Sequence, residues 1–250
     1  MRTRITRGLA AALAVPALAL TAACGGSDGA KDDTKPKAPA GTTAAGTPSA
    51  APTTSAAPEA TGPLTAAQMK GALLELKDLP SGWKGSAHAS AEFAVKADKA
   101  ECRPLAEALS AKIPGATTGP SADFALGNNA SELSESIQTF GSAADATAFT
   151  EKLSAALDSC TSFTADQDGT SMKTGVEKLT APKTAEEAIA VRLKLAVAPG
   201  VTVEPTVLVA RQGSGLIRVL HLADSAKAKG DFDAFAKLAG DKLAKAAAQG

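Results

Sequence analysis

Apolar and polar side chains alternate along residues 189–197, the period of two expected of a strand with one buried face and one wet face. Ala198-Pro199-Gly200 interrupts this run, and the alternation resumes along residues 201–209. Residues 212–215, Gln-Gly-Ser-Gly, are a turn signal before another apolar run over residues 216–222. Three successive strands on short turns predict an antiparallel meander in the C-terminal half of the chain.

The first helix is predicted by its capping residues as well as by its period. Thr65 and Gln68 have the spacing of a capping box, in which each side chain bonds the backbone N–H of the other residue. Met69, Leu73 and Leu76 follow at helical spacing and are expected to face inward. Pro and Gly a few residues later end this helix.

Three more helices are indicated further along the chain. The second is expected around Cys102, and the third opens at Ser142 with Asp145 as its capping partner. The fourth starts at Asp231 and carries acidic residues early and lysines late, which suits the helix dipole.

Weaker alternation predicts further strands over residues 122–126, 133–140 and 172–179. Helices and strands then follow in the order helix, helix, strands, helix, a run of strands, helix. This order predicts an α+β fold, in which the helices pack on one face of an antiparallel sheet. We expect a single domain over residues 63–250.

The N-terminal residues 1–23 have the pattern of a secretory signal peptide. Arg2, Arg4 and Arg7 precede an apolar run over residues 8–20, and small residues follow it. The run is shorter than the roughly 20 residues that a membrane-spanning helix needs, so we interpret it as a signal and not as an anchor.

The sequence Leu20-Thr21-Ala22-Ala23-Cys24 resembles the lipobox of bacterial lipoproteins, although Leu20 stands one residue earlier than in strict versions. The resemblance implies that Cys24 becomes the first residue of the mature chain and carries a diacylglyceryl group. Two acyl chains give stable anchoring, so we expect the protein on the outer face of the cell membrane. A plain secretory signal with an incidental cysteine is the alternative.

Residues 24–62 are expected to form the lipidated cysteine and a disordered linker. After Cys24 this segment contains no Leu, Ile, Val, Phe, Met or Trp, and Ala, Gly, Pro, Ser and Thr dominate it. Such a segment has no apolar surface whose burial could offset the entropy of ordering the chain.

The charge of the chain is balanced, with 26 Lys and Arg against 26 Asp and Glu, and only 3% of its residues are aromatic. Nucleic acid is therefore not an expected partner, because proteins that bind it normally carry an excess of basic residues and aromatic side chains that stack on the bases. Ala accounts for 58 of the 250 residues, so the 44% hydrophobic fraction supplies only one modest core.

The three cysteines have two expected uses. With Cys24 lipidated, Cys102 and Cys160 remain outside the membrane, where an oxidising environment favours a disulfide. A redox pair and a metal site are the alternatives, but the usual redox spacing is missing and His88 and His221 are the only histidines. We expect no metal and no cofactor.

Short motifs of the folded part resemble the extracellular sensor domain of mycobacterial PknH-type serine/threonine kinases and its lipoprotein relatives. They are Leu73-Leu74-Glu75-Leu76-Lys77-Asp78-Leu79-Pro80-Ser81-Gly82-Trp83, then Cys102, Phe140-Gly141-Ser142-Ala143, Leu157-Asp158-Ser159-Cys160 and Ala210-Arg211-Gln212-Gly213. The resemblance implies an α+β extracellular module with a cleft that senses or binds something. It implies no reaction, and the chain contains no kinase segment.

Two fragments look catalytic but lack their context. Ser81-Gly82-Trp83-Lys84 matches S-x-x-K and Lys173-Thr174-Gly175 matches K-T-G, two motifs of serine β-lactamases and penicillin-binding proteins. Ser81 follows Pro80 in a turn, where the motif needs a helix start, and no S-D-N occurs. We therefore assign no catalytic residue and expect that the protein is not an enzyme.

Two binding features remain. Trp83 is a candidate for lining a ligand cleft, although a tryptophan in such a position more often belongs to the hydrophobic core. Arg192, Lys194, Arg211 and Arg218 are candidates for a basic row on the solvent face of the sheet, which would face an anionic polymer or headgroup.

The sequence thus favours a lipid-anchored, non-catalytic surface protein that binds a small ligand, a lipid or an envelope component. A structural partner of an envelope complex, recognised through an exposed apolar patch, is the alternative. An envelope hydrolase is the least favoured class.

Overall fold

The computed structural model describes residues 62–86, 94–127, 131–167, 169–223 and 231–249. By its internal contacts the chain divides into Met1–Thr53 and Thr54–Gly250, and only the second unit contains described residues. The predicted signal peptide, Cys24, the linker up to residue 61 and His88 lie outside the described residues and stay predictions.

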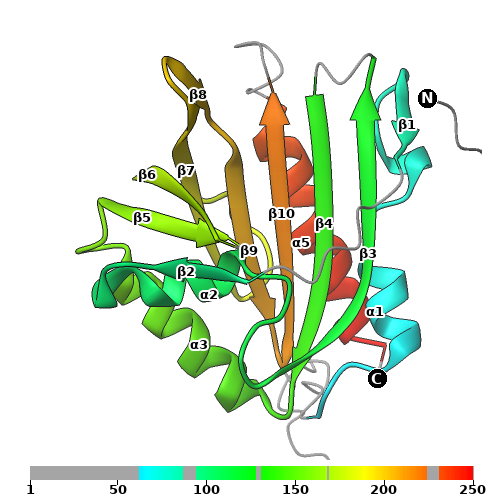
Figure 1. Cartoon of the computed structure of the whole chain (residues 1–250). Helices are drawn as coiled ribbons and strands as arrows, with labels where there is room; N and C mark the ends of the chain where they lie inside the picture. Colours follow the sequence, from blue (N-terminus) through cyan, green and yellow to red (C-terminus); the bar gives the residue numbers. More distant parts are fainter. Residues whose placement is uncertain (1–61, 87–93, 128–130, 168, 224–230, 250) are drawn as a thin grey trace, which may run out of the picture. The chain divides into compact units, whose positions relative to one another are not determined.

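The described helices and longer strands follow the predicted order, but two short strands that were not predicted lie between the first two helices (Figure 1). The helices are α1 (Ala66–Ala72), α2 (Arg103–Leu109), α3 (Ala143–Ala156) and α5 (Phe232–Ala247), with short 3-10 helices η1 (Leu76–Asp78) and η2 (Ala100–Cys102). The strands are β1 (Trp83–Gly85), β2 (Val95–Ala97), β3 (Ala116–Leu126), β4 (Ser131–Phe140), β5 (Ser162–Gln167), β6 (Thr170–Leu179), β7 (Glu187–Ala198), β8 (Val201–Val203), β9 (Thr206–Gln212) and β10 (Gly215–Ala223).

All these strands belong to one antiparallel sheet, in the order β1-β3-β4-β10-β9-β7-β6-β5-β2, with β8 paired to β7. The predicted meander is confirmed and is longer than expected, since β5, β6, β7, β9 and β10 are successive neighbours. The strand predicted over residues 201–209 is divided at Glu204-Pro205 into β8 and β9. Proline has no backbone N–H for the sheet ladder, which accounts for a break there.

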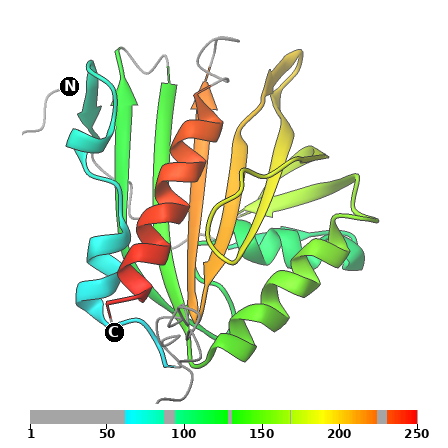
Figure 2. The ribbon, with the colours of Figure 1, turned by 180° about the vertical axis from the view of Figure 1, so that it is seen from behind.

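Helices cover both faces of the sheet, so the expectation of one covered face is corrected while the α+β class is confirmed. On one face, Leu208 of β9 and Ile217 of β10 pack in a core with Phe235 of α5, and Figure 2 shows α5 lying across these strands. On the other face, Val209 and Leu216 pack in a second core with α2 and α3. The reason is visible in β9, where five consecutive residues, 206–210, are buried.

The predicted helix starts at Thr65 and Ser142 are confirmed. The backbone N–H of Gln68 donates to Thr65 Oγ1 at 3.2 Å, and the N–H of Thr65 donates to Gln68 Oε1 at 2.8 Å. The N–H of Asp145 donates to Ser142 Oγ at 3.2 Å. Leu76 differs from its prediction, because α1 ends at Ala72 and Leu76 is 49% exposed in η1.

Candidate functional site

A cavity of about 240 Å³ lies on the α2 and α3 side of the sheet. Its walls come from β4 and β10 on one side and from β5, β6 and β7 on the other, with Val95 of β2 and Leu109 of α2 also at its lining. Figure 1 shows β2 and β5 running across the direction of β4 and β10, which brings distant parts of the sheet together. We call this space the Arg218 cavity.

The walls of the Arg218 cavity are mainly apolar. They include Phe163, Ala165, Leu193, Leu195 and Leu220. Leu193 and Leu195 are two of the alternating residues that predicted β7, and their period of two directs both to the same face. The side of β7 that was expected to be buried therefore supplies part of the cavity wall.

Arg218 places a positive charge in this apolar lining. Its Nη1 donates to the backbone oxygens of Ala108 at 3.0 Å and of Ser110 at 2.6 Å, at the C-terminal end of α2. Carbonyls at a helix C-terminus attract cations, which explains how the sheet holds the guanidinium there. Burial lowers the pKa of Arg218 to about 10, so the group stays charged at neutral pH.

No carboxylate of the described residues forms an ion pair with Arg218. Its neighbour across the strands is Ser136 of β4, whose Oγ is buried without a hydrogen-bond partner. Ser134, also in the lining, uses its hydroxyl to donate to Asp123 Oδ1 at 2.6 Å. The cavity therefore combines mainly apolar walls with a half-buried cation and an unpaired hydroxyl.

Sequence reasoning did not identify this site. Ser134, Ser136 and Gln138 are the polar positions of a strand that was predicted only by its alternation. An alternating strand is ordinarily read as having a wet polar face. Here that face lies in the interior, as shown by Gln138, which is fully buried with both atoms of its side-chain amide unpaired.

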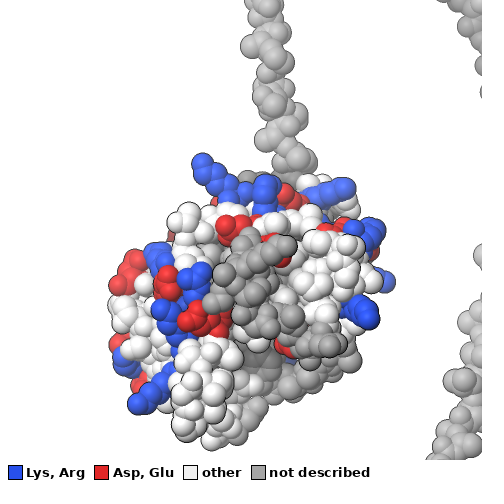
Figure 3. All heavy atoms as spheres, turned by 90° about the horizontal axis from the view of Figure 1, so that it is seen from above, with Lys and Arg blue, Asp and Glu red and all other residues white. Residues whose placement is uncertain are grey.

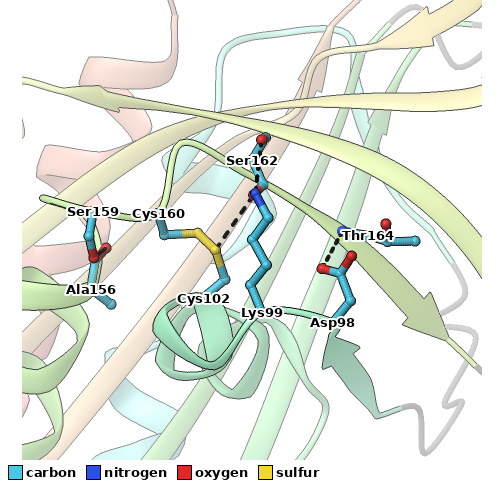
Figure 4. Close-up of a disulfide and its surroundings, with 8 residues drawn as sticks. All are labelled: Asp98, Lys99, Cys102, Ala156, Ser159, Cys160, Ser162 and Thr164. Atoms are coloured by element: carbon cyan, nitrogen blue, oxygen red, sulfur yellow. Dashed lines mark hydrogen bonds between the residues drawn. A yellow bond between two sulfur atoms is a disulfide. The ribbon is translucent and has the colours of Figure 1, made fainter.

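The predicted disulfide between Cys102 and Cys160 is present, with Cα atoms 5.1 Å apart (Figure 4). It joins the start of α2 to the segment between α3 and β5. Lys99 Nζ donates to the backbone oxygen of Ser162 at 2.6 Å beside it, and the N–H of Thr164 donates to Asp98 Oδ1 at 2.8 Å. These contacts hold β5, one wall of the Arg218 cavity, against η2 and β2.

The predicted basic row is not formed, because its members lie on opposite faces. In the register of β7 and β9, Arg192 pairs with Thr206 while Arg211 pairs with Glu187. Positions 192 and 187 are an odd number of residues apart on one strand, so their side chains point to opposite faces. Arg218 shares its face with Arg211, since Arg218 is two residues from Leu216, the partner of Arg211.

Carboxylates also neutralise three members of that row. Arg192 Nη1 and Lys194 Nζ lie 3.3 and 3.7 Å from the Glu177 carboxylate, and Arg211 is bonded to Glu186 and Glu187. Figure 3 shows the same mixture, with acidic and basic side chains beside one another on the face that it displays. A continuous anion-binding surface is therefore not present at these residues.

Trp83 lies in the core of the opposite face and not in the lining of the Arg218 cavity. It is 7% exposed, and its ring meets Phe235 edge-on at a centroid distance of 5.3 Å. His221 packs against the same Phe235, and its Nε2 lies 2.7 Å from Ser131 Oγ. Burial lowers the pKa of His221, which favours the neutral ring. Both residues stabilise packing between α5 and the sheet.

Ser81 lies in an exposed turn, and the residues after it form strand β1. The S-x-x-K motif requires its serine at a helix start, so this fragment does not have the required geometry. Within the described segments, no group of three His, Cys, Asp or Glu side chains is arranged to hold a metal ion. No helix in those segments has the length and apolar character needed to cross a membrane.

Comparison with known proteins adds two structural likenesses. No family model and no curated protein matches the sequence. The extracellular domain of PknH from Mycobacterium tuberculosis is 14% identical, and the match covers 75% of this chain and 98% of that one with a TM-score of 0.49. A putative uncharacterized protein from Mycobacterium smegmatis is also 14% identical, with 78% and 100% coverage and a TM-score of 0.42. Both TM-scores lie below 0.5.

Proposed function

We propose that this chain is a non-catalytic binding protein, held on the outer face of the cell membrane by a lipid on Cys24. Its folded domain binds a small apolar ligand in the Arg218 cavity. The observation that carries the proposal is a concave apolar site with a few polar groups at one place. This combination is typical of small-molecule sites.

The size of the cavity limits the ligand. Its volume of about 240 Å³ is below the range of about 300–1,000 Å³ that is usual for drug-sized ligands. A small or slender molecule is therefore the expected occupant. The linker of 38 residues would keep the cavity within reach of the membrane surface, where apolar molecules are plentiful.

The alternative of an assembly partner has less support. Large apolar side chains that are exposed among the described residues are Leu76, Val197 and Val201. Leu76 lies in η1, whereas the two valines belong to the β7 and β8 hairpin. Two valines at a hairpin are too small a patch to mark a stable interface.

A neutral fluorescent dye tests the proposal directly. The full chain with Cys24→Ser, which carries no acyl group that could compete, is titrated with N-phenyl-1-naphthylamine in buffer without detergent. We expect saturable binding that Met172→Trp weakens by about tenfold, because Met172 lines the cavity and the larger ring fills it.

The matched control is Lys173→Trp, which adds the same ring to an exposed neighbouring position on β6. This control should bind the dye as the parent chain does. If the dye does not bind, or if Met172→Trp and Lys173→Trp behave alike, the proposal is wrong.

A further inference from the structure

We infer that the ligand of the Arg218 cavity is a single-chain acyl carboxylate, with its carboxylate at Arg218 and Ser136 and its chain along the apolar walls. The inference rests on the proposed function and adds the chemical class of the ligand. Its basis is the position of one half-buried cation, which forms no ion pair with a carboxylate of the described residues, in a mainly apolar lining.

The charge of Arg218 requires an anion for full compensation. A guanidinium that loses water on burial is stabilised strongly only by a hydrogen-bonded negative group. Within the described residues, the guanidinium donates through Nη1 to two neutral backbone oxygens, those of Ala108 and Ser110. The donors on Nε and Nη2 are the ones that we assign to the ligand, because a guanidinium binds a carboxylate through two parallel N–H groups.

Ser136 adds a second polar contact at the same place. It lies opposite Arg218 in the register of β4 and β10, and its Oγ has no hydrogen-bond partner. A hydroxyl can rotate to donate to an anion. A bound carboxylate would accept this hydrogen bond, so the hydroxyl would no longer be buried without a partner, which is energetically unfavourable.

Charge and volume together favour a carboxylate with one chain. A single cation balances one negative charge, whereas a phosphate monoester near neutral pH carries nearly two. A two-chain lipid needs more than the cavity's 240 Å³, since this volume is already smaller than usual ligand sites. Apolar residues such as Phe163 and Leu195 line the space where the chain would lie.

Displacement of N-phenyl-1-naphthylamine from the full chain carrying Cys24→Ser distinguishes the headgroups. The competitors are decanoate, 1-decanol and decyltrimethylammonium, which share a ten-carbon chain. We expect decanoate to displace the dye at a concentration about tenfold lower than decanol, and the ammonium compound to be the weakest. Octanoate should be weaker than decanoate by about fourfold for each methylene lost.

Two variants locate the headgroup. Arg218→Met should weaken decanoate by about tenfold and leave decanol nearly unchanged, because it removes the charge but keeps an unbranched side chain. Arg192→Met is the matched control, since Arg192 is on the opposite face and does not line the cavity. It should leave both competitors unchanged.

The outcomes separate the inference from the proposed function. If the dye binds and decanol competes as well as decanoate, the carboxylate inference is overturned and the binding function stands. If neither the dye nor any competitor binds, both are overturned. Should Arg218→Met fail to fold, as judged by thermal unfolding, the comparison of decanoate with decanol on the parent chain still decides the matter.

Discussion

The backbone N–H of Leu74 donates to Glu135 Oε2 at 2.6 Å, and this hydrogen bond ties the segment after α1 to the middle of β4. The Glu135 side chain is 1% exposed, and its Oε1 has no partner. Burial raises the pKa of Glu135 to about 8, against the smaller opposing effects of the Leu74 N–H and of Lys242. At neutral pH the carboxyl is therefore mostly protonated in the folded protein.

The stability of the domain should fall as the pH rises through the range set by Glu135. Below the ordinary pKa of 4.5 the carboxyl is protonated in both the folded and the unfolded state. Between pH 4.5 and about pH 8 it ionises only in the unfolded chain, and this ionisation lowers the free energy of the unfolded state relative to the folded one. Thermal unfolding between pH 5 and pH 8 should show a falling midpoint.

Glu135→Gln isolates this effect, because the amide has the same shape and does not titrate. The difference in unfolding free energy between variant and parent should grow in favour of the variant up to about pH 8 and then level off. A constant difference over this range would contradict a raised pKa at Glu135.

The disulfide should carry a large share of the stability. Cys102 and Cys160 are 58 residues apart, and closing a loop of this length is worth about 4 kcal/mol in the chain-entropy model. Replacing both cysteines by Ala should lower the free energy of unfolding by about this amount in a urea titration. Reductant should lower the parent's stability and leave the double variant unchanged. Two titratable thiols in the oxidised, unfolded chain carrying Cys24→Ser would contradict the pairing.

Replacement by alanine should change the stability of the domain in opposite directions at two helical glycines. A Cβ at Gly240 of α5 would lie 2.9 Å from the Cβ of Thr184 and still closer to its hydroxyl. This hydroxyl shares its proton between Lys237 O at 3.1 Å and Asp241 Oδ1 at 2.9 Å, so it is not free to move away. Gly240→Ala should destabilise the domain by about 1–3 kcal/mol.

Gly71 of α1 is the matched control, since nothing lies within 4 Å of the position that its Cβ would take. Gly71→Ala should stabilise the domain by up to about 1 kcal/mol, because alanine loses less entropy in a helix. Both variants are measured by denaturant unfolding. A Gly240→Ala variant as stable as the parent would show that α5 does not pack closely on Thr184.

The lipid on Cys24 is tested in the native host by mass spectrometry of the mature N-terminus. We expect a chain that begins at Cys24 with a diacylglyceryl mass addition and incorporates labelled palmitate. Cys24→Ser should abolish labelling and release the protein from the membrane fraction, because no acyl chain would then anchor it. An unmodified Ala or Ser at the mature N-terminus would refute the lipobox interpretation.

Some features of the fold could be predicted because they depend on residues near one another in sequence. The starts of α1 and α3 follow from caps at Thr65 and Ser142, whose side chains bond backbone groups within the same turn. The meander follows from the period of two and from short turns. The pairing of Cys102 with Cys160 follows from counting, once Cys24 is assigned to a lipid.

The placement of the functional groups could not be predicted in this way. Whether Arg192 and Arg211 share a face depends on the strand register, which is a property of pairs of strands. Likewise, the alternation in β4 shows that Ser136 is on the polar face but not whether water or another part of the sheet covers that face.

The sequence by itself thus determined the α+β class, the antiparallel meander, the starts of two helices and the cysteine pair, since caps, periods and parity act locally. Only the tertiary structure decided that helices cover both faces, that the basic residues are divided between them, and that Arg218 and Ser136 meet in an apolar cavity. These features arise when segments far apart in the chain pack together, and side-chain burial and charge compensation have no meaning before that packing exists.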